Sequence, residues 1–257
     1  MLFFADRKSR QKSYLSFCKL HHLPLDPTPD TLSFFVVYMA HHINPSSVAS
    51  YLSGICSTLE PHFPGIRQAR QSILKQFSTA VHRKSPLPLE ALHHSNQTLS
   101  TSPSHDSLLF LAMLCTGFFA LLRLGELASP DNPQLRSFRK IIMRHTVHLD
   151  SDFFGFTLPY HKADRFFEGN EVRIQRQPGS FDPRRIFLAY LSRRDDLFSY
   201  RAELWIRANG DLPTRTWFLT KLHSIVPDLN IAGHSLRSGG ATYYAVQGVP
   251  DNRSSSF

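Results

Sequence analysis

In the first third of the chain, apolar residues recur at the three- and four-residue spacing of amphipathic helices. Proline-bearing segments at residues 23–30 and 44–46 interrupt this pattern and separate its helices. Asp30 and Asn44 are the expected N-caps of the second and third helices, and Pro45 suits a first helical position. The pattern predicts four short helices, at roughly residues 9–21, 30–42, 46–59 and 65–81.

A different pattern follows the polar, proline-bearing segment 83–88, which suits an extended linker between domains 1–84 and 85–257. Three later segments are rich in β-branched and aromatic residues and are separated by turn sequences, so we expect a three-stranded antiparallel sheet. These segments are residues 140–150, 153–160 and 171–177. Further helices are expected at residues 89–99, 105–122, from Pro183 after an Asp182 cap, 213–225, and 235–247 ending near Gly248. The expected fold is mainly α with a small three-stranded antiparallel β-sheet, an α+β class.

The charge of the chain is unevenly distributed. The net charge is +9, and residues 1–84 hold 10 Lys and Arg against 4 Asp and Glu, whereas residues 85–257 hold 19 against 16. Such an excess favours a polyanionic partner, because cations that neutralise phosphates release condensed counterions, although many basic proteins bind no nucleic acid. The candidate DNA-contacting residues are Arg7, Lys8, Arg10, Lys12, Lys75, Arg83 and Lys84. The first four belong to a basic cluster that is also compatible with a nuclear localisation signal.

Cysteine usage and hydropathy limit where the protein works. Cys18, Cys56 and Cys115 are odd in number and far apart, so we expect buried thiols in a reducing compartment and no disulfide framework or zinc site. The apolar stretch 108–122 is short for a membrane span and is expected to be a core helix. Without a secretory signal, we expect the nucleus in a eukaryotic host and otherwise the cytoplasm. The adjacent histidine pairs lack ligand spacing and are expected at the surface, with no metal.

Three segments carry residue types suited to phosphodiester chemistry. Breaking a phosphodiester by transesterification requires cations on the non-bridging oxygens and groups that manage protons on the nucleophile and the leaving group. Arg123 is expected to end the apolar helix, with Glu126 three residues later. Lys162 lies on the hairpin between the second and third strands, and His234 and Arg237 share one face of a helix start. Taken singly, each has a structural alternative: an Arg123–Glu126 pair at a solvated helix end, a surface lysine in a turn, and a His-x-x-Arg pattern that is frequent by chance.

In this order and at these intervals, the three segments resemble the catalytic domain of the tyrosine recombinase (phage integrase) family. The Lys162-Ala163-Asp164 hairpin and the Gly-His-Ser-Leu-Arg-Ser-Gly-Gly-Ala-Thr stretch at 233–242 look most like the Crypton-type recombinases of eukaryotic transposons. Upstream, residues 14–18 and 50–55 resemble the helical, SAM-like core-binding domain, which clamps DNA opposite the catalytic domain.

The resemblance implies a role for each matched residue. Arg123 and Arg237 would hold the phosphate, with Glu126 supporting Arg123. His234 would handle a proton, and Lys162 would protonate the leaving 5′-hydroxyl. The implied partner is double-stranded DNA, with no membrane, no metal and no cofactor, because a phosphotyrosyl bond conserves the energy of the bond that is broken.

The sequence departs from the family pattern after the His-x-x-Arg helix. No counterpart of the second His/Trp box or of the nucleophilic tyrosine follows, and Tyr243 and Tyr244 occupy positions where the family has packing residues. We therefore expect a C-terminally truncated recombinase that is inactive, or active only with a tyrosine from another subunit, and whose self-association on DNA is weak. The alternative is a DNA-binding descendant of a transposon recombinase with a structural or regulatory role and no strand transfer.

Overall fold

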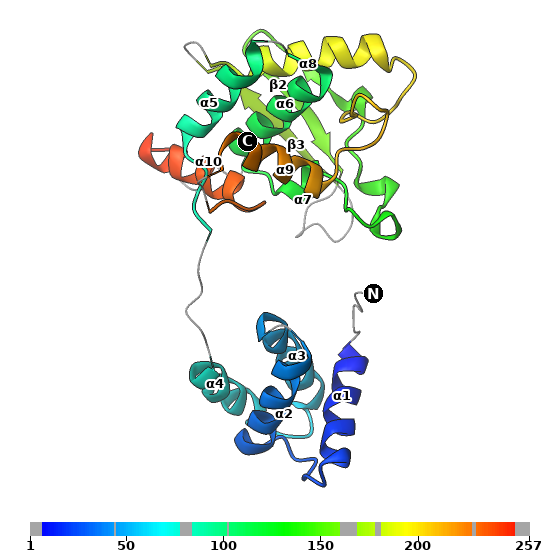
Figure 1. The fold of residues 1–257 in the computed structure, drawn as a ribbon, viewed down its shortest axis with the longest axis vertical. Coiled ribbons are helices and arrows are strands. Elements are labelled where there is room, and N and C mark those ends of the chain that lie inside the picture. Colours follow the sequence, from blue (N-terminus) through cyan, green and yellow to red (C-terminus); the bar gives the residue numbers. More distant parts are fainter. Residues whose placement is uncertain are drawn as a thin grey trace. The chain divides into compact units, whose positions relative to one another are not determined.

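The computed structural model describes residues 7–43, 45–77, 84–101, 103–159, 169–177, 181–227 and 230–249 (Figure 1). Contacts divide the chain into two compact units, Met1–His82 and Arg83–Phe257. The expected domain boundary lay two residues further along, after Lys84.

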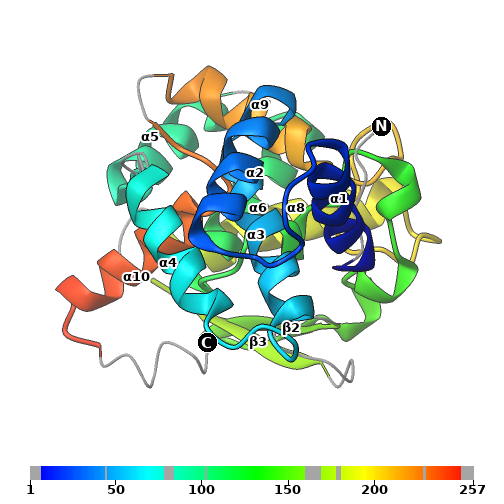
Figure 2. The same ribbon diagram turned by 90° about the horizontal axis from the view of Figure 1, so that it is seen from below.

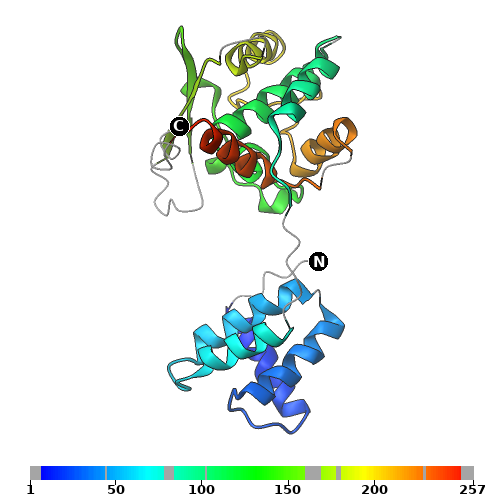
Figure 3. The same ribbon diagram turned by 90° about the vertical axis from the view of Figure 1, so that its left-hand side faces the viewer.

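The first unit is built from four helices, coloured blue to cyan in Figure 3. They are α1 (Arg7–Leu20), α2 (Pro29–His42), α3 (Pro45–Leu59) and α4 (Ile66–Phe77). Helix α3 packs on α1, and α2 packs on α4, because each turns an apolar stripe inward. The buried Tyr14 donates its hydroxyl hydrogen to Thr31 Oγ1 over 3.0 Å, which satisfies the polar tip of a core side chain.

One expected helix cap in this unit was wrong. The side chain of Thr28, and not that of Asp30, caps α2 by accepting a hydrogen bond from the Thr31 amide over 3.2 Å. Pro29 already has the φ of a first helical position, so the helix begins one residue earlier than expected and Asp30 falls in its first turn. The other expected cap, Asn44, lies outside the described residues.

The second unit is organised around α6 (His105–Phe119), whose residues are all buried from Leu109 onward. A helix that is apolar on every side needs neighbours on every side. Helices α5 (Leu89–Ser100), α8 (Pro183–Leu197) and α10 (Ser235–Val246) pack against it. Helix α9 (Arg215–Ile225) packs on α5. The expected Asp182 cap of α8 is confirmed, since its carboxylate accepts from the Arg184 amide over 3.0 Å.

The sheet of the second unit has the antiparallel order β1-β2-β3. Its strands are β1 (His148–Leu149), β2 (Phe153–Leu158) and β3 (Asn170–Gln175), and Figure 2 shows β2 and β3 side by side. Phe154 of β2 stacks on Phe187 of α8, with ring centroids 4.1 Å apart, so one face of the sheet joins the core. The expected fold class, mainly α with a small three-stranded antiparallel sheet, is confirmed.

The first expected strand, residues 140–150, is mostly not a strand. The short 3-10 turns η2 (Phe138–Lys140) and η3 (Arg144–Thr146) occupy this stretch, after η1 (Pro133–Leu135), and only His148 and Leu149 pair with β2. The Leu204 amide donates to the Ile142 carbonyl over 2.8 Å, and the Arg144 amide donates to the Ala202 carbonyl over 2.7 Å. The segment therefore pairs with a distant loop, which local residue preference cannot reveal.

The expected long helix 105–122 also ends early. Helix α6 stops at Phe119, and Leu121 adopts a left-handed backbone with φ of 53°. The chain then begins a separate short helix, α7 (Leu124–Leu127), for which Arg123 is the N-cap residue. Arg123 therefore starts a helix, and the expectation that it ends the apolar one was wrong.

All three cysteines are buried free thiols, as expected from their spacing. The expected surface position of the histidine pairs is also confirmed, because all six side chains are exposed, namely those of His21, His22, His41, His42, His93 and His94. Over the part of the chain that the structure describes, no helix combines the length and apolar character needed to cross a bilayer.

Candidate functional site

Arg123 and Glu126 form a compact unit at the start of α7. The Arg123 amide donates to Glu126 Oε2 over 2.7 Å, and its Nη1 donates to Glu126 Oε1 over 3.1 Å. The Glu126 side chain is 8% exposed, whereas that of Arg123 is 36% exposed. The buried carboxylate thus fixes both the backbone and the guanidinium of Arg123. The Nε and Nη2 atoms of Arg123 make no hydrogen bond to the described residues, which leaves donors for a ligand.

Glu126→Ala is expected to lower the free energy of unfolding by about 1–3 kcal/mol, because it leaves the Arg123 amide and guanidinium without their acceptor. Glu126→Gln should retain much of this stability, since its amide oxygen can still accept from the Arg123 amide. The measurement is urea unfolding, with Glu90→Ala as control, because Glu90 is an exposed carboxylate in the first turn of α5. Equal losses for the two alanine variants would contradict the role given to Glu126.

His234 and Arg237 lie at the start of α10, as their spacing predicted. His234 is the N-cap residue, and both side chains are exposed. Neither side chain makes a hydrogen bond to the described residues. The Leu124 amide donates to the Gly233 carbonyl over 3.5 Å. This backbone contact joins the segment after Arg123 to the segment before His234.

Close backbone packing sets the position of α10. A Cβ atom at Gly240 would lie 2.0 Å from the Phe118 carbonyl oxygen, and one at Gly239 would lie 2.1 Å from the Leu87 carbonyl oxygen. Leu236 is buried against Gly117 of α6. Gly240 therefore brings the α10 backbone directly onto the end of α6, next to the turn that leads to Arg123, and Gly239 brings it onto the backbone of Leu87.

An open pocket of about 260 Å³ lies between the starts of α7, α9 and α10. Arg123, Glu126 and His234 line it together with Arg215, the first residue of α9. The exposed guanidinium of Arg215 lies beside Gly233, its Nη2 being 3.5 Å from where a Cβ there would sit. The pocket thus brings together Arg123, its supporting carboxylate Glu126 and His234, and adds a second arginine that the sequence analysis missed.

Two other predicted residues are not placed in this pocket. Arg237 lies on the first turn of α10 but is not among the residues that line the pocket. Lys162 lies outside the described residues, so its prediction stays untested.

The hydroxyl groups of Tyr243 and Tyr244 both make hydrogen bonds within the second unit. The Tyr244 hydroxyl donates to the Phe119 carbonyl over 2.9 Å, and burial raises the pKa of Tyr244 to about 12. The Tyr243 hydroxyl bonds to Gln177 Oε1 over 3.3 Å. Both rings are half-buried and contact each other. Neither is arranged as a ready nucleophile.

The candidate DNA-contacting residues are distributed over both units. Lys12 of α1 is exposed, and Lys84 is exposed with its amine bonded to Asn230 Oδ1. Arg83 lies outside the described residues. The remaining four belong to helices α1 and α4, namely Arg7, Lys8, Arg10 and Lys75.

No protein-family profile matches the chain, and no curated protein sequence matches it. Solved structures do. Lambda integrase residues 75–356 bound to DNA is 13% identical, with a TM-score of 0.54, and the match covers 95% of this chain and 81% of that one. XerH recombinase bound to a palindromic difH substrate, in a post-cleavage complex, is 12% identical with a TM-score of 0.56, over 89% of this chain. The chain has the tyrosine-recombinase fold.

This recombinase fold is matched along most of the chain. A lambda integrase tetramer bound to a Holliday junction aligns with 97% of it, at 12% identity and a TM-score of 0.54. The chain spans less than two thirds of the XerH chains, 62% and 64% of their lengths. The structural matches establish the recombinase fold. At identities this low they assign no role to any side chain.

Proposed function

We propose that the protein binds double-stranded DNA and holds one phosphodiester in the pocket formed by Arg123, Arg215 and His234. The observation that carries the proposal is the convergence of Arg123 and His234, from distant parts of the sequence, on one pocket wall, with Arg123 anchored by a buried carboxylate. A guanidinium donates paired hydrogen bonds to phosphate oxygens and keeps its charge at every physiological pH. The likeness of the fold to recombinases solved with DNA supports the same partner here.

The start of α10 suits the same anion. His234 occupies the N-cap position of this helix and lines the pocket, so the positive end of the helix dipole faces this region and attracts negative charge. Arg237, on the same turn, adds a further exposed cation for an adjacent phosphate. We assign a phosphate-holding role to Arg123 and to Arg237, and a proton-handling role to His234.

Strand cleavage would require a nucleophile besides these cations, since bound arginines orient a phosphate but form no covalent intermediate. The hydroxyl groups of Tyr243 and Tyr244 already donate hydrogen bonds within the fold. We therefore propose that cleavage depends on a different tyrosine, such as one from another subunit. Without such a tyrosine, the protein acts as a DNA-binding relative of the recombinases, with an architectural or regulatory role.

We also propose a biological context. The first unit would act as the core-binding clamp on DNA, and the sequence stretch at 233–242 favours an origin in a Crypton-type transposon. Work on host DNA would place the protein in the nucleus of a eukaryotic cell.

Arg123→Ala and Arg237→Ala are each expected to weaken duplex binding modestly and to lower the slope of log affinity against log salt by about 1, as for one lost phosphate contact. Fluorescence anisotropy on a labelled duplex across a salt series measures both quantities. Arg193→Ala is the matched control, because Arg193 is an exposed arginine of α8 that does not line the pocket. Failure of the unaltered protein to bind any duplex at low salt would remove the proposal.

Cleavage itself is tested with a nicked suicide DNA substrate. We expect no covalent adduct from the chain alone, and an adduct when a tyrosine-bearing C-terminal fragment is added. If no such fragment yields an adduct while binding persists, the DNA-binding role stands and the enzymatic one falls.

A further inference from the structure

The start of α9 carries Arg215 into the phosphate pocket, and the first three backbone amides of this helix all have acceptors. The Arg215 amide donates to the Ser129 carbonyl over 3.1 Å. The Thr216 amide donates to Asp131 Oδ1 over 3.1 Å, and the amide after it donates to the Thr214 hydroxyl oxygen over 3.3 Å. Two of these three acceptors belong to the segment that follows α7, so this segment fixes where α9 begins.

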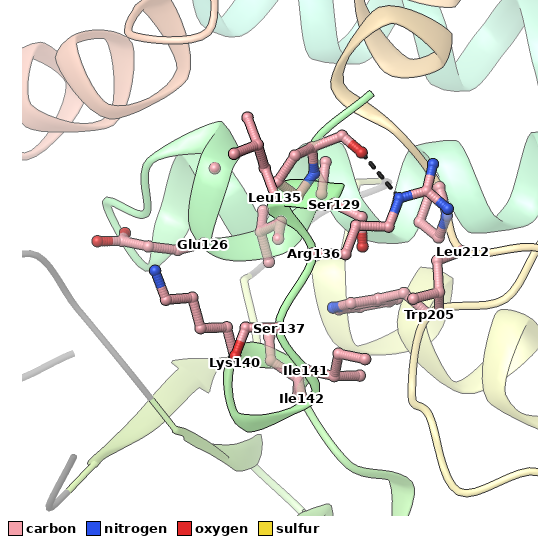
Figure 4. Close-up of a pocket in the computed structure, with 15 residues that line it drawn as sticks. Glu126, Ser129, Leu135, Arg136, Ser137, Lys140, Ile141, Ile142, Trp205 and Leu212 are labelled. Atoms are coloured by element: carbon pink, nitrogen blue, oxygen red, sulfur yellow. Dashed lines mark hydrogen bonds between the residues drawn. The ribbon is translucent and has the colours of Figure 1, made fainter. Parts of the chain in front are cut away.

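Asp131 lies in the turn by which the chain leaves α7. The Ser129 amide donates to the Pro213 carbonyl over 2.9 Å, so this segment runs beside the one that enters α9. Arg136 supports the turn, since its Nε donates to the Pro130 carbonyl over 2.9 Å, along the dashed line in Figure 4. Its Nη2 donates to the Asp131 carbonyl over 3.3 Å. The turn is thereby held in the place from which the Asp131 carboxylate reaches α9.

Packing holds this turn weakly, so its hydrogen bonds decide its position. Ser129 and Pro130 line a cavity of about 140 Å³ (Figure 4), and Asp131 is exposed. Atoms that line a cavity lack packing partners on that side. Slight desolvation opposes ionisation of Asp131, but the hydrogen bond from the Thr216 amide prevails and holds the pKa of its carboxyl below the ordinary value. A charged acceptor therefore meets the Thr216 amide at neutral pH.

The guanidinium of Arg215 is available to a ligand. The side chain is exposed, and its guanidinium forms no hydrogen bond or ion pair with the part of the chain that the structure describes. Its Nη2 lies 3.5 Å from where a Cβ atom at Gly233 would sit, in the pocket that Arg123 and His234 also line. Because an arginine side chain is long and has many rotamers, the place of its backbone decides which phosphate it can reach.

We propose that Asp131 is a positioning residue of the phosphate pocket. By holding the Thr216 amide, it fixes the start of α9 so that Arg215 and Arg123 donate to the same phosphodiester. Asp131 itself touches no DNA. This role rests on the proposed function, and it makes the effect of Asp131 depend entirely on Arg215.

A double-mutant cycle on the full chain tests this dependence, with duplex affinity measured across a salt series. Arg215→Ala should lower the slope of log affinity against log salt by about 1, as for one lost phosphate contact. Asp131→Ala should weaken binding about two- to tenfold, the range expected for one hydrogen bond, but cause no further loss in a chain that already carries Arg215→Ala. Equal losses in both backgrounds would show that Asp131 acts independently of Arg215 and would overturn the proposal.

Two variants serve as controls. Asp131→Asn should bind duplex as the unaltered protein does, because its amide oxygen still accepts from the Thr216 amide. Asp211→Ala removes an exposed carboxylate of the same unit that accepts from Asn209 Nδ2 over 2.7 Å, and it should not weaken binding. If Asp131→Asn or Asp211→Ala loses as much affinity as Asp131→Ala, the hydrogen bond to α9 is not the cause and the proposal falls.

Hydrogen exchange without DNA distinguishes failure of this role from failure of the proposed function. At the Thr216 amide we expect faster exchange in Asp131→Ala than in Asp131→Asn. Unchanged exchange in Asp131→Ala would remove the role of Asp131 and leave the proposed function standing. The same holds if Arg123→Ala weakens duplex binding and Arg215→Ala does not. If the unaltered chain binds no duplex, the proposed function itself falls, and the role of Asp131 falls with it.

Discussion

Gly240→Ala is expected to lower the free energy of unfolding of the second unit by about 3 kcal/mol or more, at the upper end of the cost of overpacking a core. The added methyl group would lie 2.0 Å from the Phe118 carbonyl oxygen, an atom of the α6 backbone that cannot turn aside as a side chain can. Helix α10 must therefore shift away from α6, and His234 and Arg237 move with it. Urea unfolding measures the loss, and duplex affinity measured well below the unfolding midpoint reports the displaced site.

Gly125→Ala is the matched control for this prediction. Gly125 lies in the short helix α7, and a Cβ atom there meets nothing within 4 Å. Because alanine favours a helix over glycine, we expect stability to be unchanged or slightly higher, within about 1 kcal/mol. A Gly240→Ala protein as stable as Gly125→Ala would show that α10 does not rest on α6 as described.

Neutralising the basic cluster at the start of the chain should reduce duplex affinity at least about tenfold at moderate salt, and flatten its salt dependence more than Arg123→Ala or Arg237→Ala does. Each cation that contacts a phosphate contributes about 0.9 to the slope of log affinity against log salt. Duplex affinity across a salt series measures both effects. The variant carries glutamine at Arg7, Lys8, Arg10 and Lys12.

The control for the cluster variant removes the same charge from the second unit. It carries glutamine at four exposed arginines that do not line the pocket, namely Arg139, Arg173, Arg193 and Arg201. Arg173 and Arg201 already pair with Glu171 and Glu203, so their positive charge is partly neutralised and attracts a phosphate less strongly. If both variants lose the same affinity, net charge explains the binding and the cluster has no special role.

Much of the fold could be predicted because its local signals agree with its tertiary packing. The periodic apolar residues of the first unit, and the Asp182-Pro183 start of α8, specify helices without reference to distant residues. The end of α6 could not be predicted in this way. Residues 120–122 continue an apolar run, and the break at Leu121 reflects how α10 and α7 pack around the turn.

The candidate site, like the fold, could be predicted from the sequence only in part. Arg123, Glu126, His234 and Arg237 were found from the residue types and spacing of two segments. Arg215 was missed because a lone arginine at a helix start carries no signal, and only folding brings it beside Gly233.

The left-handed backbone of Leu121 has a consequence for how the phosphate pocket comes into being. A leucine in this conformation is strained by about 1–2 kcal/mol and holds it only while its surroundings compensate. Its side chain is buried, and part of that burial is against Gly240 of α10. If α10 detaches, Leu121 is free to relax to a helical backbone, α6 can extend, and Arg123 swings out of line with His234. We therefore expect the pocket to form only when α10 is packed on α6, so that a partly unfolded chain keeps its arginines but loses their alignment.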